Sequence, residues 1–225
     1  MLHPCEEIFE HSLEPFLDQL VTYLKSHNLL QSGQEIDHVC YRIETINDYL
    51  RIVSEMKDKY GKVIADSMIS GRPITIIQLH EPILYQDFLI SCVELPCPKT
   101  GSFYEQGWEH IEVVIGQQGQ NCIDNKVELE KFVSEHSIEG LIFDIRAIEK
   151  HVNADVSVSV NVNIEVNKDK YSNENDLSNS GLNSNSNIVK KCSIKFHIRP
   201  LYEVCKFEMD HGLVEPVPID YFSFR

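Results

Sequence analysis

The sequence predicts an α+β fold made of two βαβββ modules, with helices on the outside of the sheet. Two observations carry this prediction. Residues 37–43 and residues 107–115 each hold an acid–His pair within a run of β-branched and aromatic residues. Each run is followed by a helical segment and by further strand patterns, so the order strand, helix, strand, strand, strand occurs twice, in residues 35–98 and 107–209. We expect the 225 residues to form one domain.

Residues 1–34 are expected to form helices that precede the first module. Apolar side chains recur at helical spacings between residues 6 and 28, as in an amphipathic helix. Pro15 interrupts this pattern, so two short helices or a kink are expected. All apolar positions fit one stripe, which favours packing against the sheet over the binding of a partner.

The first module is predicted from alternation and turn signals. Its elements are, in order, a strand at residues 37–44, a helix at 46–60 and strands at 62–69, 73–79 and 88–95. Thr45 can cap the helix. The first strand carries polar side chains on one face, namely His38, Cys40 and Arg42, and the last strand places Cys92 and Glu94 on one face.

The second module follows the same plan. Its elements are a strand from residue 109, a helix at 126–136, strands at 141–150, 155–166 and 191–197, and a final helix at 201–209. Residues 168–187 are rich in Asn and Ser and are predicted to be a disordered insertion at a hairpin tip. A C-terminal tail occupies residues 210–225.

Strict alternation sorts the polar residues of this module between two faces. It places His110 and Glu112 on one face of their strand and Glu109 on the opposite face. It also places Lys195 and His197 on the same face of the last strand.

Charge and composition narrow the classes of partner. The 35 acidic and 20 basic residues give a formal net charge of −15, which disfavours a nucleic-acid partner and an anionic membrane surface. The seven cysteines include no C-x-x-C pair, so we expect reduced thiols and a cytoplasmic location. The N-terminal residues lack a secretory pattern. A small-molecule ligand is the expected partner, and the oligomeric state stays open.

Six ordered motifs resemble the YecM family of uncharacterised bacterial proteins. They lie at residues 37–42, 71–74, 79–82, 93–96, 107–112 and 194–197. The plan of the two modules also resembles the vicinal oxygen chelate superfamily, which contains glyoxalases, bleomycin-resistance proteins and extradiol dioxygenases. The resemblance covers nearly the whole chain except the insertion. It implies that the sheet curves into an incomplete mixed β-barrel around a divalent metal ion.

The resemblance also implies a ligand set. In that superfamily the first and fourth strands of each module supply the ligands, and these places hold His38, Glu94, His110 and Lys195. Lys195 is a departure, because an ammonium group repels a cation. Glu112 or His197 could supply the missing ligand instead. The donor types suit Fe, Mn, Zn or Ni.

Further roles are expected around such a metal. Glu112 is the candidate general base. Arg42 is expected either to hold a substrate carboxylate or to pair with Glu94 or Glu112. Cys92, Lys195 and His80 are expected in the substrate pocket, His80 because Pro82 would end its strand near the rim.

The implied function is that of a metal-dependent isomerase, lyase or dioxygenase acting on a small oxygen-rich metabolite. Two alternatives stay open. The cup could bind a small molecule without metal, or the N-terminal helices could make the protein a scaffold for a protein partner.

Overall fold

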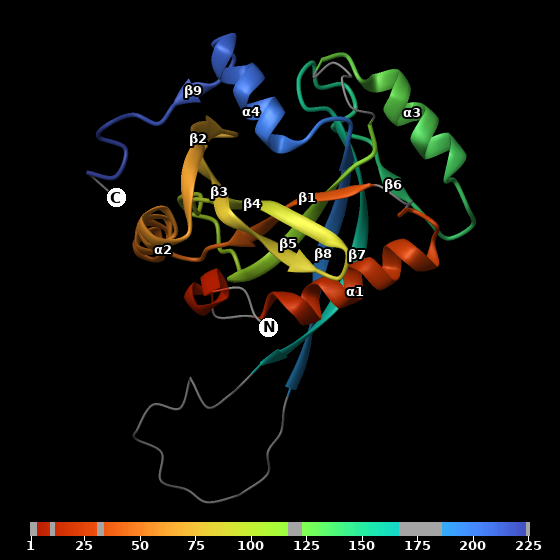
Figure 1. Ribbon diagram of the computed structural model, residues 1–225, viewed down its shortest axis with the longest axis horizontal. Coiled ribbons are helices and arrows are strands. Elements are labelled where there is room, and N and C mark those ends of the chain that lie inside the picture. The colour runs from red at the N-terminus through yellow and green to blue at the C-terminus, as the bar shows by residue number, and fades with distance from the viewer. Residues whose placement is uncertain (1–3, 10–11, 31–33, 117–122, 167–185, 224–225) are drawn as a thin grey trace, which may run out of the picture.

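The computed structural model describes residues 4–9, 12–30, 34–116, 123–166 and 186–223 (Figure 1). Its elements are η1 (Pro4–Ile8), α1 (Leu13–Ser26), β1 (Glu35–Arg42), α2 (Ile46–Lys59), β2 (Gly61–Ile69), β3 (Arg72–Tyr85), β4 (Phe88–Pro96), β5 (Gly107–Val114), α3 (Lys126–Glu135), β6 (Phe143–Asp144), β7 (Asp155–Val166), β8 (Ser186–His197), α4 (Leu201–Asp210) and β9 (Glu215–Pro216).

The described strands form one mixed sheet in the order β6-β7-β8-β5-β1-β4-β3-β2-β9. Each module contributes four consecutive strands, and the modules meet where β1 pairs with β5 in antiparallel. Within the modules, β1 pairs with β4 and β5 pairs with β8, both in parallel. Over the described ranges the sheet stays open between β6 and β9, which is the predicted α+β architecture with an incomplete barrel.

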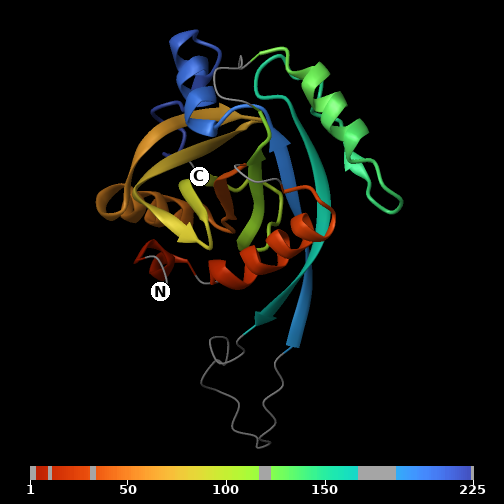
Figure 2. The same cartoon turned by 45° about the vertical axis from the view of Figure 1, so that its right-hand side comes forward.

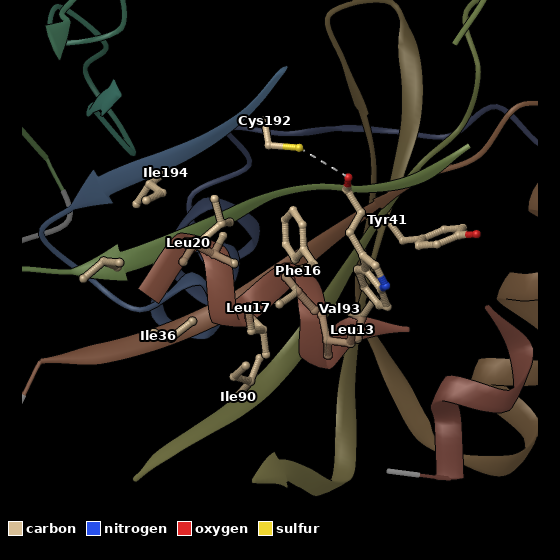
Figure 3. Packing of buried hydrophobic residues seen from close by; sticks show 14 of the residues in the cluster. Leu13, Phe16, Leu17, Leu20, Ile36, Tyr41, Ile90, Val93, Cys192 and Ile194 are labelled. Carbon is tan, nitrogen blue, oxygen red and sulfur yellow. Dashed lines mark hydrogen bonds between the residues drawn. The ribbon is translucent and has the colours of Figure 1, made fainter. Parts of the chain in front are cut away.

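Helix α1 covers one face of the central strands (Figure 3). Its apolar stripe is buried against side chains such as Ile36, Val93 and Ile194. Pro15 lies in the first turn of the helix, where its missing N–H has no intrahelical partner to lose. The predicted break between two helices therefore falls before Leu13, after η1, and not at Pro15.

The other helices flank the sheet (Figure 2). Thr45 caps α2 as predicted, since its Oγ1 accepts a hydrogen bond from the backbone N–H of Asp48 at 3.1 Å. Helix α3 lies outside β7, and α4 lies beside β2. None of the helices in the described ranges combines the length and apolarity that crossing a bilayer requires.

The prediction of a strand over residues 141–150 was wrong except for Phe143–Asp144. The Asp144 carboxylate accepts a hydrogen bond from the backbone N–H of Arg146 at 3.0 Å, and the backbone then turns between Ile145 and Lys150. A side chain that bonds its own backbone two residues on competes with strand pairing.

Strand β3 continues through Pro82 to Tyr85, so Pro82 does not end it as predicted. The pairing of β3 with β4 is irregular between Gln78 and Ile83. Proline is tolerated at such a bulge because the ladder needs no N–H there. His80 consequently lies in mid-strand, where its side chain is exposed.

Strands β7 and β8 form a long hairpin that extends beyond the rest of the sheet (Figure 1). Strand β8 begins at Ser186, earlier than the predicted residue 191. Of the predicted insertion, residues 168–185 lie outside the described residues, and residues 186–187 belong to β8. In the predicted tail, β9 pairs with β2.

Candidate functional site

The face of the central strands opposite α1 borders a cavity of about 620 Å³. Alternation along β1 explains this arrangement, because Val39 and Tyr41 belong to the core that includes α1 while Arg42 faces the cavity. The polar wall includes Arg42, Glu94, His110, Glu112 and Lys195. Apolar side chains of β3 and α4 form the facing wall, among them Ile74, Ile76, Leu201 and Cys205.

Four potential ligands converge beside this cavity, and we call them the His–Glu cluster. Its members are His38 of β1, Glu94 of β4, and His110 and Glu112 of β5. One ligand atom from each residue lies within 4.8 Å of the others. The cluster forms because β5, β1 and β4 are neighbours in the sheet. The sequence-predicted candidates His38, Glu94, His110 and Glu112 are thus brought together.

His38 is fully buried, and the neighbouring Asp37 fixes the orientation of its ring. Its Nδ1–H donates to the Asp37 carboxylate at 2.9 Å, which directs Nε2 toward Glu112 at 3.5 Å and Glu94 at 3.7 Å. Nε2 has no hydrogen-bond partner. A carboxylate behind the far nitrogen is the usual support of a metal-binding imidazole. The chemistry of His38 therefore fits a metal ligand.

Lys195 enters the same cluster from β8. Its Nζ donates to Oε1 of Glu112 at 2.7 Å and lies 3.0 Å from Nε2 of His110. The ammonium group thus contacts two of the four potential ligand atoms. A metal ion that used all four would have to displace it.

The buried charges stabilise one another. Burial alone would raise the pKa of Glu112, but the positive charges of Lys195 and His38 hold it well below its ordinary value. Burial would lower the pKa of Lys195, and the charges of Glu112 and Glu94 raise it instead. Glu112 is thus a carboxylate suited to hold a cation and, while paired with Lys195, a weak base.

Strand irregularities bring two further carboxylates to the site. Cys40 pairs with His110 and Tyr41 pairs with Trp108, so Glu109 is an extra residue in β5. Such a bulge shifts the alternation by one residue. The prediction that Glu109 faces away was therefore wrong, because Glu109 lines the cavity next to His110.

Asp37 is the corresponding extra residue in β1, between Ile36 and His38. Its buried carboxylate serves two elements, because it accepts from Nδ1 of His38 and from the backbone N–H of Leu201 at 2.8 Å. Leu201 begins α4, and a carboxylate at a helix N-terminus is favourable. Asp37 therefore joins the His–Glu cluster to α4.

Arg42 pairs with Glu109 and not with Glu94 or Glu112 as one prediction had it. The Arg42 guanidinium carbon lies 4.8 Å from the centre of the Tyr104 ring, and that of Arg72 lies 5.5 Å from it. No role at the site was predicted for Tyr104 or Arg72. Arg72 lies within the family motif at residues 71–74 but outside the acid–His strands, and Tyr104 lies outside all six motifs.

The remaining predicted residues lie outside the cluster. His197 is buried beneath Glu112, with its Nε2 3.7 Å from Oε2 of Glu112, and burial lowers its pKa. Cys92 is buried in the apolar cluster with Leu201 and is not part of the cavity wall. Burial raises its pKa to about 12, so the thiol is neutral. His80 lies away from the cavity.

The chain is similar to a described protein family and to two known proteins. The model of the family described as "YecM protein" matches residues 6–208. An uncharacterised protein of Haemophilus influenzae is 29% identical over 111 residues, which are 48% of this chain and 52% of that protein. Protein YecM of Escherichia coli is 41% identical over 58 residues, which are 26% of this chain and 31% of that protein. The alignments thus span about half or less of these relatives.

A solved structure described as "Structural Genomics, Protein EC4020" has a TM-score of 0.56 at 18% identity. The match covers 92% of this chain and 98% of that one. The two proteins therefore share a fold.

Proposed function

This chain belongs to the YecM family, and we propose that its His–Glu cluster binds a divalent metal ion that holds a small oxygen-rich ligand in the cavity. The observation that carries the proposal is the convergence of four ligand atoms within 4.8 Å. Among them is the buried Nε2 of His38, which faces the carboxylates of Glu94 and Glu112 without a hydrogen-bond partner. Two imidazoles and two carboxylates suit Fe, Mn, Zn or Ni.

Lys195 gives the metal-free protein a cation in the same place. Its ammonium group neutralises part of the charge of Glu112 and Glu94, which would otherwise repel each other in a buried site. Exchange of this ammonium for a divalent metal ion replaces one positive charge with two, which balances the two carboxylates of the cluster. Lys195 is 28% exposed, which leaves its side chain room to turn toward the cavity.

The chain would support the ligand as follows. A metal bound here would act as a Lewis acid toward adjacent oxygen atoms of the ligand, as in isomerases, lyases and dioxygenases. Asp37 fixes the ring of His38, and the apolar wall of Ile74 and Leu201 restricts water on the facing side. The displaced ammonium group of Lys195 would be free to donate a hydrogen bond to the ligand.

A second candidate function is a binding protein that works without metal. The observation that favours it is the position of Lys195, which already satisfies Glu112. The scaffold alternative lacks comparable support, because the apolar stripe of α1 is buried against the sheet.

Elemental analysis of protein purified without chelators tests the proposal. Wild type should contain about one equivalent of a transition metal, whereas His38→Ala and His110→Ala should contain little. His80→Ala is the matched control, because this exposed histidine lies outside the cavity and should not affect the metal content. Folded wild-type protein that takes up none of Fe, Mn, Zn or Ni, even when these are supplied, would leave the metal-free binding protein as the better account.

A further inference from the structure

Two arginines that line the cavity flank the Tyr104 ring. Arg42 and Arg72 both line the cavity, and the guanidinium carbons of both lie over the Tyr104 ring. Arg72 is held in place by a tight hairpin, because Ser70 and Gly71 have φ angles of 52° and 80° and connect β2 to β3 in two residues. The position of Arg72 is therefore set by the backbone.

The two arginines differ in their partners. Arg42 is neutralised by Glu109. Arg72 has no ion pair in the described part of the chain, and its buried Nε and Nη1 atoms, like those of Arg42, have no hydrogen-bond partner. A half-buried guanidinium without a counterion, beside a second guanidinium, is electrostatically unfavourable. Burial and the charge of Arg42 accordingly lower the pKa of Arg72.

We propose that Arg72 binds an oxyanion, either a carboxylate or a phosphate, which is part of the ligand held in the cavity. An anion there would relieve the repulsion between the two guanidinium groups and would supply the counterion that Arg72 lacks. The carboxylates of Glu94 and Glu112 disfavour an anion beside the His–Glu cluster, so the charges of the cavity wall orient the ligand.

This inference rests on the proposed function, since the oxyanion belongs to the same ligand whose other oxygen atoms the metal would hold. A series of contacts links Arg72 to the His–Glu cluster. It runs from Arg72 over Tyr104 to Arg42, then to Glu109 and His110. The ligand class is thus a small molecule with an anionic group at one end and a metal-binding oxygen at the other.

Calorimetric titration of the metal-free full chain with sodium phosphate and with sodium oxalate tests the inference, with sodium chloride at equal ionic strength as the reference. Wild type should bind at least one of the two oxyanions, and the one bound more tightly identifies phosphate or carboxylate as the group recognised. Arg72→Gln should bind it at least about 10-fold more weakly, as expected for the loss of a charged hydrogen bond. Arg51→Gln, which removes an exposed arginine of α2, should bind like wild type.

A wild type that binds neither oxyanion more tightly than chloride would overturn the inference, and so would Arg72→Gln binding as tightly as wild type. Arg72→Lys keeps the charge if the Gln variant fails to fold, and it should bind several-fold more weakly because an ammonium group lacks the planar fork. Metal content is measured on the same proteins. Metal uptake without anion binding contradicts this inference alone, whereas anion binding without metal uptake contradicts the proposed metal site alone.

Discussion

Replacement of Lys195 by Met is expected to change metal affinity and metal-free stability in opposite directions. The variant keeps a side chain of similar length but removes the ammonium group that contacts Glu112 and His110. In wild type, an incoming metal must first break the 2.7 Å hydrogen bond between Lys195 and Glu112. In the variant it does not.

The size of both effects follows from this contact. A hydrogen bond to a charged group contributes about 1.5–3 kcal/mol, so Lys195→Met should bind metal roughly 10- to 150-fold more tightly. Without metal, Glu112 loses its buried partner, which costs about 3–5 kcal/mol. Because the Lys195 side chain is 28% exposed, we expect the lower end of that range.

Two measurements check these values. Competition with a chelating dye gives the Kd for Mn²⁺ and Zn²⁺, and urea unfolding of the metal-free protein gives the free energy of unfolding. Metal at 100 times its Kd should restore roughly 2.7 kcal/mol to the variant.

Lys206→Met is the control, because Lys206 forms an exposed pair with Asp210 on α4 and should leave both quantities nearly unchanged. A Lys195→Met variant that binds metal no more tightly than wild type would refute this prediction. A metal-free variant as stable as wild type would also refute it, because Lys195 would then not act as the internal cation of the cluster.

Three further predictions concern single residues, namely Asp37, Thr45 and Tyr85. Asp37→Asn should weaken metal binding about 10- to 100-fold in the same dye assay, and unchanged affinity would refute its support of the neighbouring imidazole. Thr45→Ala should lower the free energy of unfolding by about 1 kcal/mol without changing metal affinity, and a stability equal to wild type would argue against the cap. Burial and the hydrogen bond to Asp18 raise the pKa of Tyr85 above its unfolded value of about 10. Its contribution to stability is therefore present below that pH and is lost as the pH rises above it. Tyr85→Phe should flatten the loss of stability in alkaline urea titrations, and identical profiles would contradict this.

Most of the fold follows from local patterns. The alternating residues of β7 and the apolar stripe of α1 are each read within one segment, and Thr45 caps α2 through a contact three residues away. The errors arose where a local side chain or a neighbouring strand changes the outcome. Asp144 turns the backbone where a strand was expected, and Pro82 is accommodated by an irregular pairing with β4.

The residues of the candidate site were likewise predictable only in part. Alternation along each strand predicts the face that His38, Arg42 and Glu94 occupy on their own strands. The pairing of β1 with β4 then brings His38 and Glu94 together. Glu109 and Asp37 escaped this reasoning. Each is the extra residue of a bulge, and a bulge is defined by the pairing of two strands that lie far apart in the sequence.

The sequence by itself determined the two modules, most of the elements within them and the polar strand faces that carry the histidines. Only the tertiary structure decided that Lys195 donates to Glu112 within the cluster, that Glu109 neutralises Arg42, and that Arg72 is left without a counterion. The physical reason is that secondary structure depends on neighbours a few residues away. The charge balance of a buried site depends on which side chains of distant strands are brought within a few ångströms of one another.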